Sequence, residues 1–256
     1  MLQPERGSSY RSRVLFSAVI VFLLTFPVFR GMIETIKYAV EIERSGRSSD
    51  TEDVPADLPF YFFAGKVEFG VQFREILQRL EETPVIAAVR DDKWEAALNG
   101  PAQVIFYLSA DLLTVGGRIR EAHEKGKLLM IHIDLAEGIG KDRAGIRYLK
   151  TCGADGILST RANLIRLARE QELLAIQRFF LLDSKGLESI DEMLKSSSPH
   201  MMELMPGVID KAIARFCKGN IPVIAGGLIE TKAEVTSALG HGATAVSTGN
   251  TELWYL

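Results

Sequence analysis

The segment IPVIAGGLIET (Ile221–Thr231) joins a short apolar run to a pair of glycines and then to the helix-length stretch Thr231–Leu239. A second apolar run, Ala245–Ser247, follows and ends in Thr248-Gly249-Asn250. Short apolar runs that alternate with segments of helical period predict βα units and a parallel sheet. The same unit recurs upstream at a spacing of roughly 20–25 residues, so the two glycines belong to one member of a series.

The series predicts eight strands and the helices between them. The strands are Val85–Val89, Val104–Leu108, Leu128–Ile133, Gly156–Ser159, Leu174–Phe179, Met201–Leu204, Pro222–Ala225 and Ala245–Ser247. The helices are Asp92–Asn99, Leu113–Lys125, Arg143–Thr151, Ala162–Gln171, Leu187–Lys195, Val208–Lys218 and Thr231–Leu239, with Glu252–Leu256 as a remnant. Eight units in about 190 residues predict an α/β fold, a small (β/α)8 TIM-type barrel. An open doubly wound sheet would need a glycine fingerprint after its first strand, where the chain has Arg90-Asp91-Asp92-Lys93. A further helix, Glu68–Leu80, is expected to close the bottom of the barrel.

Composition limits the class of protein. Hydrophobic residues make up 47% and charged residues 25% of the 256 residues, which is typical of a folded globular chain. With 30 Lys and Arg against 33 Asp and Glu, the net charge is −3, so nucleic-acid binding would need a local basic patch. Cys152 and Cys217 are isolated from one another, which favours a reducing, cytoplasmic location.

Residues 1–66 differ from the barrel region 67–256. The apolar run Val14–Phe29 follows Arg6, Arg11 and Arg13, and its 16 residues fall short of the ~20 that span a bilayer as a helix. A short polar helix and an acidic, Ser-rich linker follow it. Three interpretations stay open: a membrane anchor, a buried helix of a soluble fold, and an extension upstream of a working protein that begins near Val67.

The ends of strands seven and eight predict a phosphate site. Active and binding sites of this architecture lie at the carboxyl ends of the strands. Gly226 and Gly227 let the backbone approach an oxyanion, and Ser247, Thr248 and Asn250 add side-chain donors. The alternative is that the glycines serve only tight turns.

Other polar residues are expected at the same mouth. Arg161 follows strand four and could clamp a phosphate or pair with an acid at the rim. Of the neighbours Gln177 and Arg178 on strand five, Gln177 is the one we expect to face inward. Asp134 and Glu203 are expected as mouth carboxylates able to accept hydrogen bonds from ligand hydroxyls.

Several chemistries are not favoured by the sequence. His132 and Asp134 form only a weak metal motif without a third ligand, and a hydrogen-bonded interior His132 is the simpler interpretation. No lysine ends a strand, which argues against a Schiff-base aldolase, and no cofactor fingerprint is present. Asp134 and Glu203 could still form the acid–base pair of a sugar-phosphate isomerase or epimerase.

A local basic surface is expected on two neighbouring helices. Arg143, Arg147 and Lys150 are spaced as one helical stripe, and Arg166 and Arg169 lie on the next helix. They could form an RNA-binding patch or simply the solvated faces of ordinary helices. Aromatic residues for base stacking are scarce there.

Several blocks then carry a resemblance to a known family. They are VIAAVRDDKWEAAL (Val85–Leu98), MIHIDLAEGIGKD (Met130–Asp142), GILSTRANLIRLA (Gly156–Ala168), AIQRFFLLDSKGLE (Ala175–Glu188), MELMPG (Met202–Gly207), IPVIAGGLIET (Ile221–Thr231) and STGNTELW (Ser247–Trp254). Together they resemble the glycerol-3-phosphate-responsive antiterminators, regulators of bacterial glycerol uptake operons.

The resemblance implies a non-catalytic (β/α)8 barrel that binds sn-glycerol 3-phosphate and then engages leader mRNA. It implies that the phosphate lies on Gly226, Gly227, Ser247, Thr248 and Asn250, with Arg161 and Gln177 contributing and with Asp134 and Glu203 facing the glycerol hydroxyls. Ligand binding would shift a population of barrel or homo-oligomer states. The N-terminal extension departs from the family pattern, which keeps a membrane-tethered metabolite-binding module open as an alternative.

Overall fold

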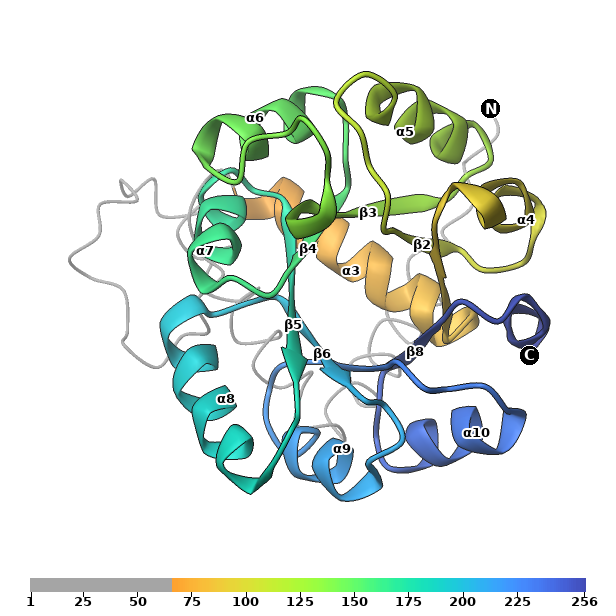
Figure 1. The fold of residues 1–256 in the computed structure, drawn as a ribbon, viewed down its shortest axis with the longest axis vertical. Coiled ribbons are helices and arrows are strands. Elements are labelled where there is room, and N and C mark those ends of the chain that lie inside the picture. Colours follow the sequence, from red (N-terminus) through yellow and green to blue (C-terminus); the bar gives the residue numbers. More distant parts are fainter. Residues whose placement is uncertain (1–65) are drawn as a thin grey trace, which may run out of the picture. The chain divides into compact units, whose positions relative to one another are not determined.

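The computed structural model describes residues 66–256 of the chain, and these residues form a closed eight-stranded parallel barrel (Figure 1). The strands follow one another around the ring in chain order. They are β1 (Val85–Val89), β2 (Val104–Tyr107), β3 (Leu128–His132), β4 (Gly156–Ser159), β5 (Leu174–Phe180), β6 (Met201–Met205), β7 (Val223–Gly226) and β8 (Ala245–Thr248).

Helices surround the ring of strands, as a TIM-type barrel requires. They are α4 (Trp94–Asn99), α5 (Val115–Glu124), α6 (Arg143–Thr151), α7 (Ala162–Glu170), α8 (Ser184–Ser197), α9 (Asp210–Phe216) and α10 (Lys232–Gly240). Short 3₁₀ turns follow β1 (η1, Asp91–Lys93), β3 (η2, Ile133–Leu135) and β8 (η3, Thr251–Tyr255). The predicted fold class is therefore confirmed: β1 and β4 have the predicted boundaries, and each strand end that differs does so by one residue.

Alternation along the strands divides the apolar residues into an inner and an outer core. Phe106 and Met130 pack with the cluster inside the barrel, whereas their neighbours Ile105 and Ile131 pack in the cluster between sheet and helices. Successive side chains of a strand point to opposite faces, and both faces of this sheet are covered. The near-continuous apolar strands are a consequence of that double burial.

Helix α3 (Lys66–Glu82) closes the amino-terminal end of the barrel, as the sequence predicts. Its side chains Ile76 and Leu80 are fully buried and belong to the inner apolar cluster. Figure 1 shows the helix lying across the ring of strands rather than beside it. Burial of two large aliphatic side chains stabilises this arrangement by about 1.5–3 kcal/mol for each.

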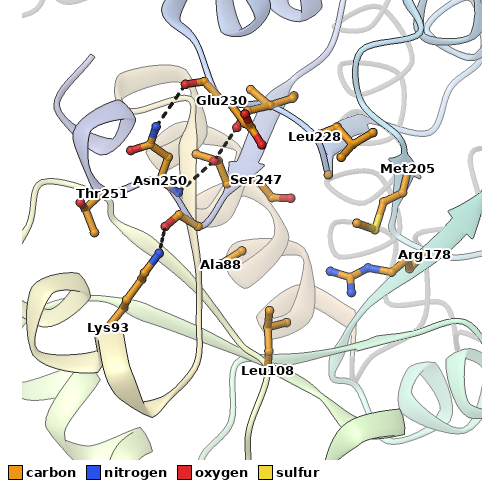
Figure 2. A pocket seen from close by; sticks show the side chains of 14 residues that line it. Ala88, Lys93, Leu108, Arg178, Met205, Leu228, Glu230, Ser247, Asn250 and Thr251 are labelled. Carbon is orange, nitrogen blue, oxygen red and sulfur yellow. Dashed lines mark hydrogen bonds between the residues drawn. The ribbon is translucent and has the colours of Figure 1, made fainter.

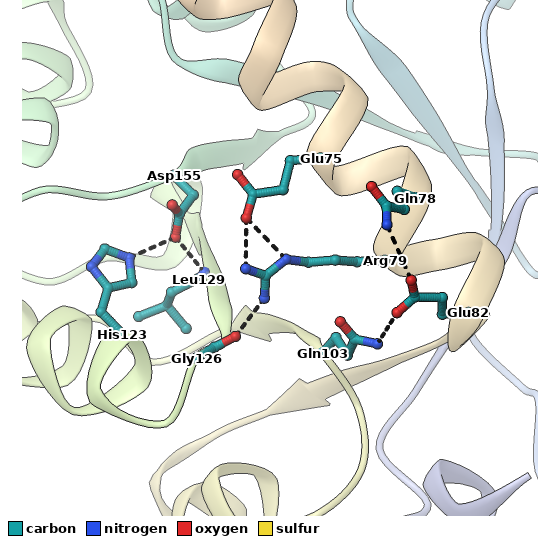
Figure 3. A network of polar contacts seen from close by, with 9 residues as sticks. All are labelled: Glu75, Gln78, Arg79, Glu82, Gln103, His123, Gly126, Leu129 and Asp155. Carbon is teal, nitrogen blue, oxygen red and sulfur yellow. Dashed lines mark hydrogen bonds and ion pairs between the residues drawn. The ribbon is translucent and has the colours of Figure 1, made fainter. Parts of the chain in front are cut away.

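Polar contacts fix α3 at this end (Figure 3). Arg79 pairs with Glu75 at 2.6 Å and donates to the carbonyl of Gly126, just before β3. Glu82 accepts a hydrogen bond from Gln103, the residue before β2, at 3.1 Å. These contacts lie at the amino ends of the strands, so the carboxyl ends on the opposite side stay open.

The segments predicted at the N-terminus, including the apolar run 14–29 and the linker, lie outside the described residues. Within residues 66–256, each helix falls below the length or the apolar content needed to cross a lipid bilayer.

Candidate functional site

A cavity of about 680 Å³ opens at the carboxyl ends of the strands (Figure 2). This volume lies within the range usual for small-molecule sites. The lining residues come from β1, β5, β6 and β8, from the segments just after β1 and β2, and above all from the loops after β7 and β8. They are Ala88, Lys93, Leu108, Arg178, Met205, Gly227, Leu228, Ile229, Glu230, Ser247, Thr248, Gly249, Asn250 and Thr251. Gly227, Ser247, Thr248 and Asn250 are thus brought together as the sequence predicts.

The β7 loop turns sharply at the cavity. Gly227 has φ +73° and Leu228 has φ +58°, so two consecutive residues adopt left-handed backbone. Such a conformation is costly for a leucine, and strained backbone of this kind concentrates at binding sites. Among residues 66–256, no acceptor takes a hydrogen bond from the amides of Gly227, Leu228 or Gly249. Gly227, Leu228 and Gly249 line the cavity, so their unengaged amides are candidates for contacts with an anion.

Side chains of the β8 loop tie it to the β7 loop. Thr248 Oγ1 donates to the Ile229 carbonyl at 2.8 Å, and Asn250 Nδ2 donates to the Glu230 carbonyl at 3.1 Å. The backbone N–H of Asn250 donates to Thr248 Oγ1 at 3.1 Å. Thr248 and Asn250 therefore fix the relative position of the two loops that carry the available amides.

Two cationic side chains that the sequence did not predict as site residues line the cavity. Lys93, in the turn after β1, donates from Nζ to the Gly249 carbonyl in the loop after the neighbouring strand β8, at 2.6 Å. Arg178 extends from β5 into the cavity between Met205 and Leu108 (Figure 2). Lys93 lies in the turn after β1, four residues beyond the end of the strand, so a search restricted to strand ends does not find it. The signal for Arg178 was its register opposite Glu203 on β6.

Arg178 and Glu203 form a buried ion pair inside the barrel. Arg178 Nε lies 2.6 Å from Glu203 Oε2, and Ser247 Oγ donates to Glu203 Oε1 at 2.5 Å. Their side chains are 9% and 0% exposed, respectively. Gly226 makes this arrangement possible, because a β-carbon there would overlap Glu203 Oε1 and lie 2.6 Å from Ser247 Oγ. Both carboxylate oxygens of Glu203 are therefore engaged by protein donors, and Glu203 is not among the residues that line the cavity.

The inward orientation expected for Gln177 is wrong. Ser197 of α8 donates a hydrogen bond to Gln177 Oε1, so the glutamine faces the helices. Because neighbours on a strand point to opposite faces, its neighbour Arg178 is the residue that faces inward. The arginine finds the partner that such burial requires in Glu203.

His132 lies inside the barrel at 4% exposure, near Arg178 and Glu203. Burial, reinforced by the positive charge of Arg178, lowers the pKa of the imidazole. Within the described part of the chain, Nδ1 has no hydrogen-bond partner, which departs from the hydrogen-bonded histidine expected from sequence. His132 is not among the residues that line the cavity.

Asp134 and Arg161 meet beside the mouth but do not line the cavity. Asp134 accepts hydrogen bonds from Ser159 Oγ at 2.8 Å and from the amide of Thr160 at 2.7 Å. Burial opposes ionisation of Asp134, but these hydrogen bonds outweigh it and lower the carboxyl pKa. Arg161 Nε lies 3.6 Å from Asp134 Oδ1, which is the rim ion pair that the sequence left as an alternative.

The five basic residues singled out on α6 and α7 lie on adjacent helices. Several are engaged with neighbouring elements: Arg143 pairs with Glu170 at 2.5 Å, and Lys150 with Glu172 at 3.4 Å. Arg166 and Arg169 donate to carbonyls of Ser196 and Ser198. The surface is basic, but Glu170 and Glu172 neutralise part of its positive charge.

The site is therefore suited to holding an anion. It offers available amides, one ammonium and one guanidinium at a single mouth, the donor set that phosphate binding requires. An acid–base enzyme would need free carboxylates at the reacting atoms. Asp134 and Glu203 are instead occupied by protein donors and lie outside the cavity lining.

Comparison with known proteins places the chain in a family. The sequence model for the family "glycerol-3-phosphate responsive antiterminator" matches residues 85–254. The uncharacterized protein YgcP of Escherichia coli (strain K12) is 34% identical over 184 residues, which are 71% of this chain and 96% of that protein.

Two solved structures are similar in both sequence and fold. The glycerol uptake operon antiterminator regulatory protein from Listeria monocytogenes is 35% identical with a TM-score of 0.63, over 66% of this chain and 94% of that one. The glycerol uptake operon antiterminator-related protein from Thermotoga maritima is 30% identical with a TM-score of 0.62, over 68% and 99%. The chain belongs to the glycerol-3-phosphate-responsive antiterminator family.

Proposed function

We propose that this protein binds sn-glycerol 3-phosphate in the mouth cavity and, when occupied, prevents termination by engaging leader mRNA of glycerol-utilisation genes. The observation that supports it most is the juxtaposition of available amides from the β7 and β8 loops with Lys93 and Arg178 in one cavity. The family of the chain supports the identity of the ligand.

In this proposal the phosphate lies on the amides of Gly227, Leu228 and Gly249. Lys93 Nζ, 2.6 Å from the Gly249 carbonyl, is close enough to that loop to contact a phosphate oxygen. Charge-assisted hydrogen bonds of this kind are about twice as strong as neutral ones. The glycerol carbons would then lie over Ala88, Leu108 and Met205, the apolar part of the lining.

The other expected site residues act as supports. Glu203 holds Arg178 by its ion pair, and Ser247 holds Glu203 in turn. The pair Asp134 and Arg161 ties the β3 loop to the β4 loop at the rim. None of these roles requires direct contact with the ligand.

Antitermination that depends on the ligand is the first expected outcome. In cells that carry the full chain and a leader terminator before a reporter gene, read-through should rise when sn-glycerol 3-phosphate accumulates. A Lys93→Met variant should lose the response, because the phosphate loses its ammonium partner. Read-through that is independent of sn-glycerol 3-phosphate would contradict the proposal.

For the RNA, we propose the stripe Arg143, Arg147 and Lys150 on α6, extended by Arg166 and Arg169 on α7. All three stripe residues are exposed, and the guanidinium of Arg147 has no partner among the described residues. Reversal of the three to Glu should weaken leader RNA binding by at least about 100-fold, because backbone contacts dominate RNA affinity. Filter binding or fluorescence anisotropy measures it.

A matched control uses α9 and the residues just after it. Lys211, Arg215 and Lys218 have the same spacing and exposure, so their reversal to Glu changes the net charge equally. This control should keep most RNA affinity, and both triple variants should bind sn-glycerol 3-phosphate normally. Equal loss in the two triples would show that overall charge, and not the α6 stripe, governs binding.

A further inference from the structure

Outside the cavity, a cluster of six side chains lies at the turn that carries Lys93. We infer that Asp91 is a positioning residue of the effector site: it fixes the η1 turn so that Lys93 is held at the anion. The inference rests on the proposed function, because it concerns the affinity for sn-glycerol 3-phosphate. It assigns a role to residues that touch no ligand themselves.

Asp91 is held from three directions by neighbouring elements. Tyr107 at the end of β2 donates from its hydroxyl to Asp91 Oδ1 at 2.6 Å, and Ser109 donates to Oδ2 at 3.1 Å. Arg118 of α5 lies 3.3 Å from Oδ1. The hydrogen bond from Tyr107 contributes most to lowering the pKa of the Asp91 carboxyl, so Asp91 is present as a carboxylate. One carboxylate thereby joins the β1 loop to β2 and α5.

The residue after Lys93 is fixed as well. Trp94 is 1% exposed, its Nε1 donates to Glu121 at 2.8 Å, and its ring lies 5.0 Å from that of Tyr107. Arg118 stacks over the same indole at 5.0 Å. Lys93 therefore lies between two residues whose side chains are locked by packing and hydrogen bonds.

The turn needs this support. A three-residue 3₁₀ helix is weak by itself, and η1 has no side-chain cap at its start. Lysine is a flexible chain with a point charge, so its contribution to binding depends on how well its backbone is oriented. Preorganised groups contribute more affinity because less freedom is lost on binding.

A double-mutant cycle tests the inference in the full chain. Calorimetry with sn-glycerol 3-phosphate would compare wild type, Asp91→Ala, Lys93→Met and the double variant. Lys93→Met should raise Kd about 30-fold, the loss of one charge-assisted hydrogen bond, and Asp91→Ala about tenfold. In the Lys93→Met background, Asp91→Ala should change Kd by less than about twofold, because its effect acts through that lysine.

Two further variants keep the result decisive. Asp91→Asn replaces Asp91→Ala in the experiment if the alanine variant folds poorly. It retains an acceptor for Tyr107 and should therefore raise Kd by a smaller factor. Asp191→Asn, which loses an exposed ion pair with Arg215 at 2.7 Å, should leave Kd unchanged. If Asp91→Ala multiplies Kd by the same factor in both backgrounds, or leaves it unchanged in wild type, the inference is overturned. Absence of binding by wild type would instead overturn the proposed function and the inference with it.

Discussion

Replacing Arg178 by Met is expected to lower the free energy of unfolding by about 3–5 kcal/mol, because it leaves a buried charge without its partner. Glu203 is 0% exposed and lies inside the barrel, where its Oε2 accepts only from Arg178 Nε among the described residues. Methionine fills similar space but cannot compensate the carboxylate. Urea unfolding of the full chain at neutral pH measures the change.

The reverse experiment removes both charges. Arg178→Met combined with Glu203→Gln should recover most of the lost stability, because a neutral pair avoids the cost of an isolated buried ion. The exposed pair Arg215 and Asp191 serves as the control, and Arg215→Met should cost less than about 1 kcal/mol. A double variant no more stable than Arg178→Met alone would contradict this explanation.

Gly227→Asp should weaken binding of sn-glycerol 3-phosphate by more than about 100-fold, since like charges brought together cost several kcal/mol. The new carboxylate would extend from the β7 loop that offers amides to the phosphate. The backbone at φ +73° adds about 1–2 kcal/mol of strain for a residue with a side chain. Isothermal titration calorimetry gives the affinity.

The control for this substitution is Gly126→Asp. Gly126 has φ +69°, a β-carbon there would meet no atom within 4 Å, and the residue lies before β3 at the closed end of the barrel. It therefore reproduces the backbone strain and the charge of Gly227→Asp away from the cavity, but not the 2.6 Å approach of a Gly227 β-carbon to Met205 Cε, and its Kd should match wild type. Gly227→Asp that binds as tightly as Gly126→Asp would remove the β7 loop from the phosphate site.

Much of the fold follows from the sequence because periodicity is local. The apolar run Val85–Val89 and the helix Arg143–Thr151 have the predicted boundaries, since turn residues limit them on both sides. The β7 and β8 loops could be identified for the same reason, because Gly227 and Asn250 follow their strands directly. Parallel strands then bring the two loops together without further information.

The direction in which a side chain points, into the barrel or toward the helices, cannot be predicted from one strand alone. Alternation shows that Gln177 and Arg178 point oppositely, but only the register with β6 shows that Arg178 shares the face of Glu203. Lys93 was missed for a different reason: its Nζ contacts the loop after the neighbouring strand β8, 156 positions away in sequence. Contacts of that kind arise from closure of the barrel, which no local pattern encodes.

The partners of the rim charges were also beyond the sequence. Asp134 was expected to accept hydrogen bonds from ligand hydroxyls. Instead, donors at the end of β4 donate to both of its carboxylate oxygens. A carboxylate at a strand end looks the same in sequence whether it serves a ligand or a neighbouring loop. The difference depends on which donors the adjacent strand brings within about 3 Å.

A crystal structure of the full chain with sn-glycerol 3-phosphate tests the central claim most directly. It should place the phosphate within hydrogen-bonding distance of the Gly227 and Gly249 amides and of Lys93 Nζ, with the carbons toward Leu108. A phosphate bound instead at Arg161, or outside the barrel mouth, would contradict the account.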